Sequence, residues 1–324
     1  MGEHTAVLIR GLRGPWGRLL LGVAGLSLVA YLVRGAGAGR VGRVLWLSRR
    51  WIPVVLLLEV TQLLSDVVAL RTLVTQRTRD IRPSTWVRSS TVAYAMMVLL
   101  PAGRAAGEVA RASLIARHVG GPFAATASAR LQTAYLAALA LASGVAGASV
   151  AGSAGLRSPL TILLLANAIL TACVAAGLLT LLRDARIGGW LEQLRRRFGG
   201  NASPEPTATD LGARRFPWRA LAACSGGRAA QLLEYGILLS AVGGVATVRG
   251  ALTAHGIGLV GATLGDVVPN QLGVTDGAYR TFAPLLGLGA APARALSIAF
   301  IAHAAQLTVA GACVLVASLT RRGA

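Results

Sequence analysis

The chain has 324 residues, of which 54% are hydrophobic and 14% charged, and its 32 basic and 12 acidic residues give a net charge of +20. Several apolar runs approach or exceed the roughly 18 residues that indicate a membrane span, which excludes an ordinary soluble domain and predicts an all-α, polytopic membrane protein. Every basic residue is arginine. In a soluble protein this charge would suggest nucleic acid, but here the arginines mostly lie between apolar runs, where they orient the chain and meet anionic head groups. We therefore expect membrane lipids, and no nucleic acid, as partners.

The first apolar run, residues 19–33, follows several arginines, and no convincing small-residue cleavage site comes after it. These features favour an uncleaved membrane span at about residues 17–33 over a signal peptide. An arginine-rich loop, residues 34–50, leads from it to the second span, with an interfacial helix at about residues 44–51 as an alternative.

The second expected span, residues 51–70, carries Glu59, Gln62 and Asp66. Their spacing places all three on one helical face. That face must look inward, because an ionisable group that faces lipid is costly. The face either fixes helix packing or belongs to a functional site, and we include Asp66 among the candidate substrate-binding residues.

The stretch 99–111 interrupts the next apolar run. That run, residues 87–100, is shorter than the roughly 20 residues that a helix needs to cross a bilayer. Pro101 cannot donate a backbone hydrogen bond and Gly103 permits a turn. The charged residues that follow, among them Arg104, predict a re-entrant hairpin that returns with its charges facing protein or water. The alternative is an ordinary interfacial helix after a short span.

The remaining spans are expected at residues 123–150, 160–182, 220–245 and 292–319. The arginine-rich stretch 183–219, whose central part is rich in Pro, Gly and Ser, is predicted to be a cytoplasmic linker. The span 220–245 carries Arg228, Gln231 and Glu234 on one face. For His303, in the last span, a hydrogen-bonded place in the core is the favoured interpretation.

A second charged turn lies in the C-terminal half. Asp266 precedes Pro269, and Asp276 and Arg280 follow it, again after a short apolar run. The order of these features matches the first turn and predicts a second re-entrant hairpin. Hairpins of this kind meet near the midplane in many transporters.

The two halves repeat the same order of features. Glu108 and Asp276 each lie seven residues after a proline, and a polar-faced span precedes each turn. We therefore expect a single membrane domain, residues 1–324, with a first repeat at 51–150 and a second at 220–319. With six spans and two hairpins, the repeats are inverted relative to each other.

This topology places both termini, the loop 71–88 and the linker 183–219 in the cytoplasm, as the positive-inside rule prefers. The five arginines of residues 34–50 are the exception, because they fall on the outer side. The expected location is the plasma membrane.

The stretch Leu100-Pro101-Ala102-Gly103-Arg104-Ala105-Ala106-Gly107-Glu108-Val109-Ala110-Arg111 resembles the "LPG…GE…R" block of a flippase-like family, which is named for the membrane region of lysylphosphatidylglycerol synthases. Residues 269–276 resemble its second block, although Asn270 and Gln271 replace glycines and Asp276 stands where glutamate is usual. The resemblance covers about residues 15–320 and implies a lipid-translocating membrane domain. Because no soluble transferase domain is attached, we do not expect this chain alone to synthesise an aminoacyl lipid.

The charged turns suggest how a lipid head group crosses. Arg104 and Arg111 can hold a phosphate through charge-assisted hydrogen bonds, and the carboxylates can pair those arginines or bind a cationic head group. Alternatively, Glu108–Arg111 and Asp276–Arg280 are structural ion pairs. The candidate substrate-binding residues are Arg104, Glu108, Arg111, Asp276, Arg280, Asp266, Asp66 and Glu234.

The expected function is therefore a lipid flippase or transporter that moves an anionic lipid or a lipid-linked intermediate. The alternative is an integral-membrane scaffold or accessory subunit of a lipid- or glycan-modifying enzyme, with a partner synthase or transferase and no transport. The sequence has no phosphate-binding loop, no His/Asp cluster and no Ser/His pairing. We therefore expect no enzymatic activity, no catalytic residue, no metal and no cofactor.

Overall fold

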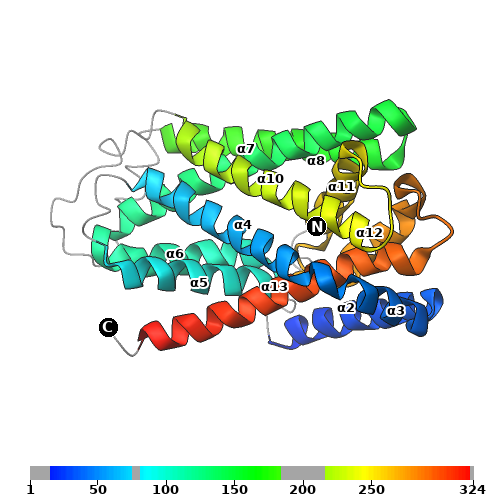
Figure 1. Cartoon of the computed structure of the whole chain (residues 1–324). Helices are drawn as coiled ribbons and strands as arrows, with labels where there is room; N and C mark the ends of the chain where they lie inside the picture. The colour runs from blue at the N-terminus through cyan, green and yellow to red at the C-terminus, as the bar shows by residue number, and fades with distance from the viewer. Residues whose placement is uncertain (1–14, 75–80, 184–215, 322–324) are drawn as a thin grey trace.

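The computed structural model describes residues 15–74, 81–183 and 216–321. In these ranges the chain forms helices and no strands (Figure 1), which confirms the predicted all-α polytopic fold. The elements are α2 (Pro15–Ala36), α3 (Ala38–Ser48), η1 (Arg49–Trp51), α4 (Ile52–Leu73), α5 (Pro83–Leu99), α6 (Gly103–Val119), α7 (Gly121–Ala154), α8 (Pro159–Arg183), α10 (Trp218–Ala241), α11 (Val248–Gly265), η4 (Pro269–Gln271), α12 (Val274–Phe282), η5 (Ala283–Leu286) and α13 (Pro292–Arg321). Most of the expected linker 183–219, part of the loop 71–88 and both chain ends lie outside the described residues.

Four described helical segments are long and apolar enough to cross a membrane, namely Ala38–Leu73, Phe123–Ala154, Pro159–Leu182 and Pro292–Thr320. They contain four of the six predicted spans. The other two predicted spans are also helical, as α2 with 22 residues and α10 with 24. Helix α10 carries Arg228 and Glu234 in its middle, as α4 carries Glu59 and Asp66.

The bundle is apolar outside and partly polar inside. Exposed apolar side chains cover the outer faces of several helices, for example Leu57, Val145, Ile169, Leu315 and Leu319. Seven acidic, arginine and histidine residues in the described ranges are instead buried, namely Glu59, Arg111, Arg130, Glu234, His255, Asp276 and His303. This distribution suits a protein whose outer surface is solvated by hydrocarbon.

Two helical hairpins occupy opposite ends of the bundle (Figure 1). In the first, α5 packs against α6, and in the second, α11 packs against α12. The turns at the tips of the two hairpins are nevertheless in contact, since the Ala102 N–H donates a hydrogen bond of 2.9 Å to the Asp266 carbonyl oxygen. Between the hairpins, α4 packs along α10.

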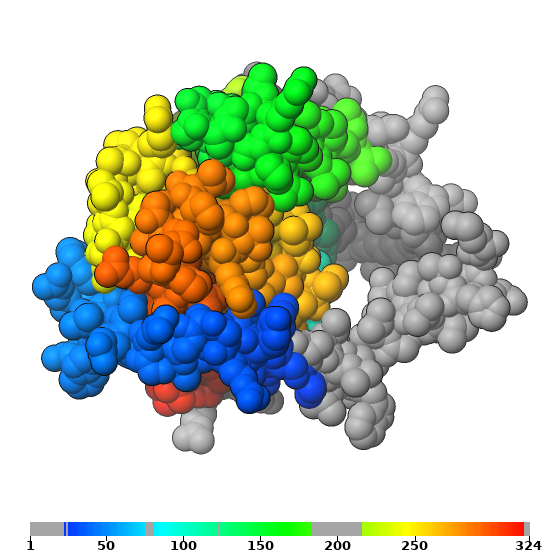
Figure 2. All heavy atoms as spheres, turned by 90° about the vertical axis from the view of Figure 1, so that its right-hand side faces the viewer, coloured from blue at the N-terminus to red at the C-terminus, as the bar shows by residue number. Residues whose placement is uncertain are grey.

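A long helix from each half of the chain packs against the hairpin of the other half. Helix α13, from the second half, packs against α5, and α7, from the first half, packs against α11. Helix α8 lies along α7, and α2 and α3 lie against α13. Viewed from the end that holds the second hairpin, the start of α13 lies between α7–α8 and α2–α3 (Figure 2).

Small residues allow the first hairpin to close tightly. A Cβ atom added to Gly107 would lie 2.5 Å from the Ala93 carbonyl oxygen, and one added to Gly103 would lie 2.2 Å from that of Met97. Close backbone approach at small residues is typical of helix packing in membranes, where no hydrophobic force drives helices together.

Candidate substrate-binding site

A polar cavity of about 440 Å³ lies at the centre of the bundle. Residues of α4, α5, α6, α7, α8, α10, α11, η4 and α13 line it. Its polar side chains include amides and hydroxyls, namely Gln132, Asn167, Thr171, Gln231, Thr263 and Gln306. Its ionisable side chains include Glu59, Asp66, Arg104, Arg228 and Asp266. This volume falls within the range of about 300–1,000 Å³ that is usual for small-molecule sites.

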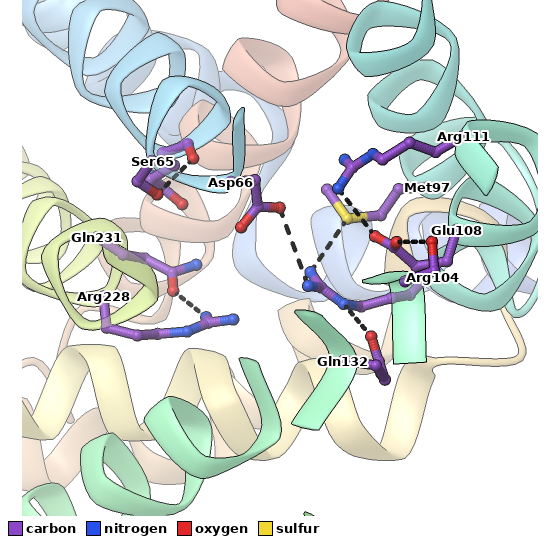
Figure 3. A network of polar contacts seen from close by, with 11 residues as sticks. Ser65, Asp66, Met97, Arg104, Glu108, Arg111, Gln132, Arg228 and Gln231 are labelled. Atoms are coloured by element: carbon purple, nitrogen blue, oxygen red, sulfur yellow. Dashed lines mark hydrogen bonds and ion pairs between the residues drawn. The ribbon is translucent and has the colours of Figure 1, made fainter. Parts of the chain in front are cut away.

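Arg104 reaches into this cavity from the first turn of α6. Its Nε donates to the Gln132 Oε1 at 3.3 Å, and its Nη2 lies 3.9 Å from the Asp66 Oδ2 (Figure 3). That separation is an ion pair but is too long for a hydrogen bond. The buried Nη2 has no hydrogen-bond partner. Arg104 therefore presents an unused cationic donor, and within the described residues Asp66 is its ion-pair partner.

A second arginine faces the first. The Arg228 Nη1 donates to the Gln231 Oε1 at 2.5 Å, and its guanidinium lies 4.4 Å from the centre of the Tyr135 ring. The guanidinium of Arg104 also lies over this ring. In Figure 3 the two guanidinium groups point toward one another from opposite sides of the view. Tyr135 thus holds two cations beside one space through cation–π contacts.

Glu108 and Arg111 form a separate pair on α6. The Arg111 Nη1 lies 3.1 Å from the Glu108 Oε1, and Ser128 of α7 donates a long hydrogen bond to the Glu108 Oε2 at 3.5 Å. Neither residue lines the cavity. The pair matches the structural alternative considered from the sequence, and the ion-pair partner of Arg104 is instead Asp66 of α4.

The inward faces predicted for 51–70 and 220–245 meet where α4 packs on α10. The Gln62 Nε2 donates to the Glu234 Oε2 at 2.6 Å and to the Glu59 Oε2 at 3.2 Å. The Tyr94 hydroxyl donates to the Glu59 Oε1. The structure thus brings Glu234 to the border of the cavity, and Glu59 lines it.

Asp276 and Arg280 lie apart from the arginines of the cavity. The Asp276 Oδ2 accepts a hydrogen bond of 2.7 Å from the Gly273 N–H and lies 3.5 Å from the His303 Nε2. The Arg280 guanidinium lies against Gly35 of α2. Within the described residues, the ion partner of Asp276 is thus His303 and not Arg280. His303 is buried in the core, as expected, but neither of its ring nitrogens has a hydrogen-bond partner in the described part of the chain, so the expected hydrogen bond is not found.

A different helix start explains why the two matched acidic residues have different surroundings. Helix α6 begins two residues after Pro101, whereas η4 delays the start of α12 until five residues after Pro269. Seven residues after the proline, Glu108 is therefore in the second turn of its helix, whereas Asp276 is in the first turn, where its carboxylate caps free N–H groups.

The two tips share an unusual backbone conformation. Ala102, Asn270 and Gln271 are the non-glycine residues with positive φ in the described ranges, at 49°, 49° and 56°. A left-handed conformation costs such residues about 1–2 kcal/mol, less for asparagine. Strain of this kind persists only where the surrounding structure imposes it, and it clusters at functional sites.

Sequence reasoning missed the contribution of α7 and α8. Gln132 and Tyr135 lie three residues apart in an Ala-rich span, and this polar pair was the available signal. Asn167 of α8 donates to the Ser143 Oγ at 2.9 Å and accepts from Thr263 at 3.2 Å, so it ties α7, α8 and α11 together. Single polar residues in apolar spans give no indication of which neighbour they meet.

Residues 16–313 match the family described as the lysylphosphatidylglycerol synthase TM region. The chain belongs to this family. No curated protein and no solved structure matches the chain. Membership in the lysylphosphatidylglycerol synthase TM family confirms the resemblance carried by the two proline-containing blocks and associates the chain with lipids in a membrane. The match spans α3 to α12 entirely and α13 as far as residue 313, so it includes both hairpins and every residue that lines the cavity.

Proposed function

We propose that this protein is a lipid flippase or transporter that moves an anionic lipid, or a lipid-linked intermediate, by passing its head group through the central cavity. The observation that carries the proposal is the pair of guanidinium groups, Arg104 and Arg228, beside one polar space inside an apolar bundle. A phosphate is costly to desolvate in hydrocarbon, and two guanidiniums offset that cost. The unused Nη2 of Arg104 supplies a donor for a phosphate oxygen.

The arrangement of the hairpins suits movement between two leaflets. We infer that both hairpins are re-entrant and that residues 51–150 and 220–319 form an inverted repeat. The reciprocal packing of α5 on α13 and of α11 on α7 supports this inference. In such repeats, rocking of one half against the other exposes a central site to each side in turn. We further propose a plasma-membrane location with both chain ends in the cytoplasm, from the distribution of arginines.

Leaflet exchange in vesicles tests the proposal. The purified chain is reconstituted in phosphatidylcholine vesicles that contain a fluorescent phosphatidylglycerol, and a membrane-impermeant quencher measures how much probe reaches the outer leaflet with time. We expect Arg104→Ala and Arg228→Ala each to slow exchange at least about tenfold, because loss of one charge-assisted bond to phosphate costs about 1.5–3 kcal/mol. Arg157→Ala is the matched control, since Arg157 is exposed in the loop between α7 and α8.

Two results would contradict the proposal. Equal exchange rates in vesicles with the wild type and in protein-free vesicles would show that the chain does not transport lipid. That result would favour the accessory-subunit alternative. Equal rates for Arg104→Ala and Arg157→Ala would mean that lipid moves elsewhere than through the cavity.

A further inference from the structure

The carboxyl groups of Glu59 and Glu234 form a buried pair at the junction of the two halves. Glu59 lies on α4 and Glu234 on α10, and their side chains are 3% and 2% exposed. One amide joins them, because the Gln62 Nε2 donates to an oxygen of each. The two carboxyl groups are held near each other by this shared amide nitrogen.

Neutral donors supply the direct contacts of this pair. The Gln62 amide and the Tyr94 hydroxyl donate to it, and within the described ranges neither carboxylate has an arginine or histidine nitrogen within ion-pair distance. The titratable groups that face the pair are Tyr94 on α5, Arg228 and Tyr235 on α10 and Tyr279 on α12, and Cys313 on α13 faces Tyr94. The phenols and the thiol are neutral near pH 7.

Arg228 is therefore the one cation in this group, and it is engaged elsewhere. Its guanidinium donates to Gln231 and lies beside the Tyr135 ring. Even if the whole charge of Arg228 is assigned to the pair, two ionised carboxylates would leave one net negative charge on two almost fully buried residues. Uncompensated buried charge of this kind is avoided by protonation.

We propose that Glu59 and Glu234 together bind one proton and that this proton is coupled to head-group movement. The pair is placed for coupling, because Glu59 lines the cavity while Glu234 belongs to the other half of the bundle. Rocking of the halves changes the contact between α4 and α10 and thus the distance between the carboxyl groups. When the two carboxyl groups separate, neither has a second carboxyl group beside it with which to hold the proton. The proton then leaves through the cavity. This inference rests on the proposed transport function and names the proton as the ion that is coupled to it.

Infrared spectroscopy of the membrane-embedded full chain tests the proton site without any transport. At pH 7 we expect a protonated carboxylic C=O band in the wild type that is lost in Glu59→Gln and in Glu234→Gln. Asp66→Asn is the matched control, because Asp66 has Arg104 as its cationic partner and lies on the same helix, and it should keep the band. A wild type without this band, or a band that persists in both glutamine variants, would overturn the proposal.

The vesicle assay tests the coupling. With a pH-sensitive dye inside, the wild type should acidify or alkalinise the lumen as lipid moves, and the exchange rate should change by up to about tenfold per pH unit, the factor for one linked proton. In the double variant Glu59→Gln, Glu234→Gln, any exchange that remains should be independent of pH, because neither position can bind or release a proton. Exchange that is independent of pH in the wild type would overturn coupling. If the wild type shows no exchange at any pH, the proposed transport is refuted. The infrared band would still decide whether the proton site exists.

Discussion

Closure of the α5–α6 hairpin depends on Gly107, and Gly107→Ala should open it. The added Cβ would lie 2.5 Å from the Ala93 carbonyl oxygen, which is main chain and cannot rotate away. To restore an ordinary contact of 3.4 Å, the helices must separate by about 0.9 Å. Overpacking of this size costs about 1–3 kcal/mol, partly offset by the higher helix propensity of alanine, which contributes up to about 1 kcal/mol.

The effect can be measured by SDS titration of the purified protein in mixed micelles, followed by far-UV circular dichroism. We expect Gly107→Ala to lower the free energy of unfolding by about 1–2 kcal/mol. Gly144→Ala in α7 is the control, because a Cβ there meets no atom within 4 Å, and it should be neutral or slightly stabilising. If the two variants are equally stable, the hairpin is not held by close backbone packing.

Further predictions concern the tips, the α12 cap and the topology. Ala102→Gly should stabilise the protein by up to about 1 kcal/mol in the same titration, because glycine adopts the φ of 49° freely, whereas Ala102→Pro should destabilise it because the N–H bonded to Asp266 is lost. Asp276→Ala should cost about 1 kcal/mol through loss of the bond to the Gly273 N–H, and no change would contradict a capping role. Single cysteines at Ser153 and Ser203 should react with an impermeant reagent from opposite sides of the membrane, and labelling from one side would refute the six-span topology.

Periodicity predicted the helical spans and the inward polar faces correctly. The faces of Glu59–Asp66 and Arg228–Glu234 meet because an ionisable face has one stable place in a membrane bundle, which is against another such face. The pairing of Glu108 with Arg111 followed from a spacing of three on one helix. Contacts within one helix are thus accessible to sequence reasoning.

Contacts that depend on where a helix starts, or on which helix packs beside it, could not be predicted from the sequence. The spacing of seven residues suggested equal roles for Glu108 and Asp276, but η4 shifts the start of α12 and turns Asp276 into a cap. The cavity partners of Arg104, which are Gln132 and Tyr135 of α7, depend on how α6 lies against α7. No local pattern encodes that packing.

The main-chain hydrogen bond between the hairpin tips affects how their sequences can diverge. The Ala102 N–H and the Asp266 carbonyl oxygen exist whatever the side chains are, so substitution at either position, except by proline at 102, preserves the contact. The selective constraint on the tips therefore falls on backbone conformation and not on residue identity. This explains how the second tip replaces the glycines of the family block with Asn270 and Gln271 while both residues keep positive φ angles. In a search for distant relatives, helix breaks at these two places should persist after the recognisable letters of the blocks have been lost.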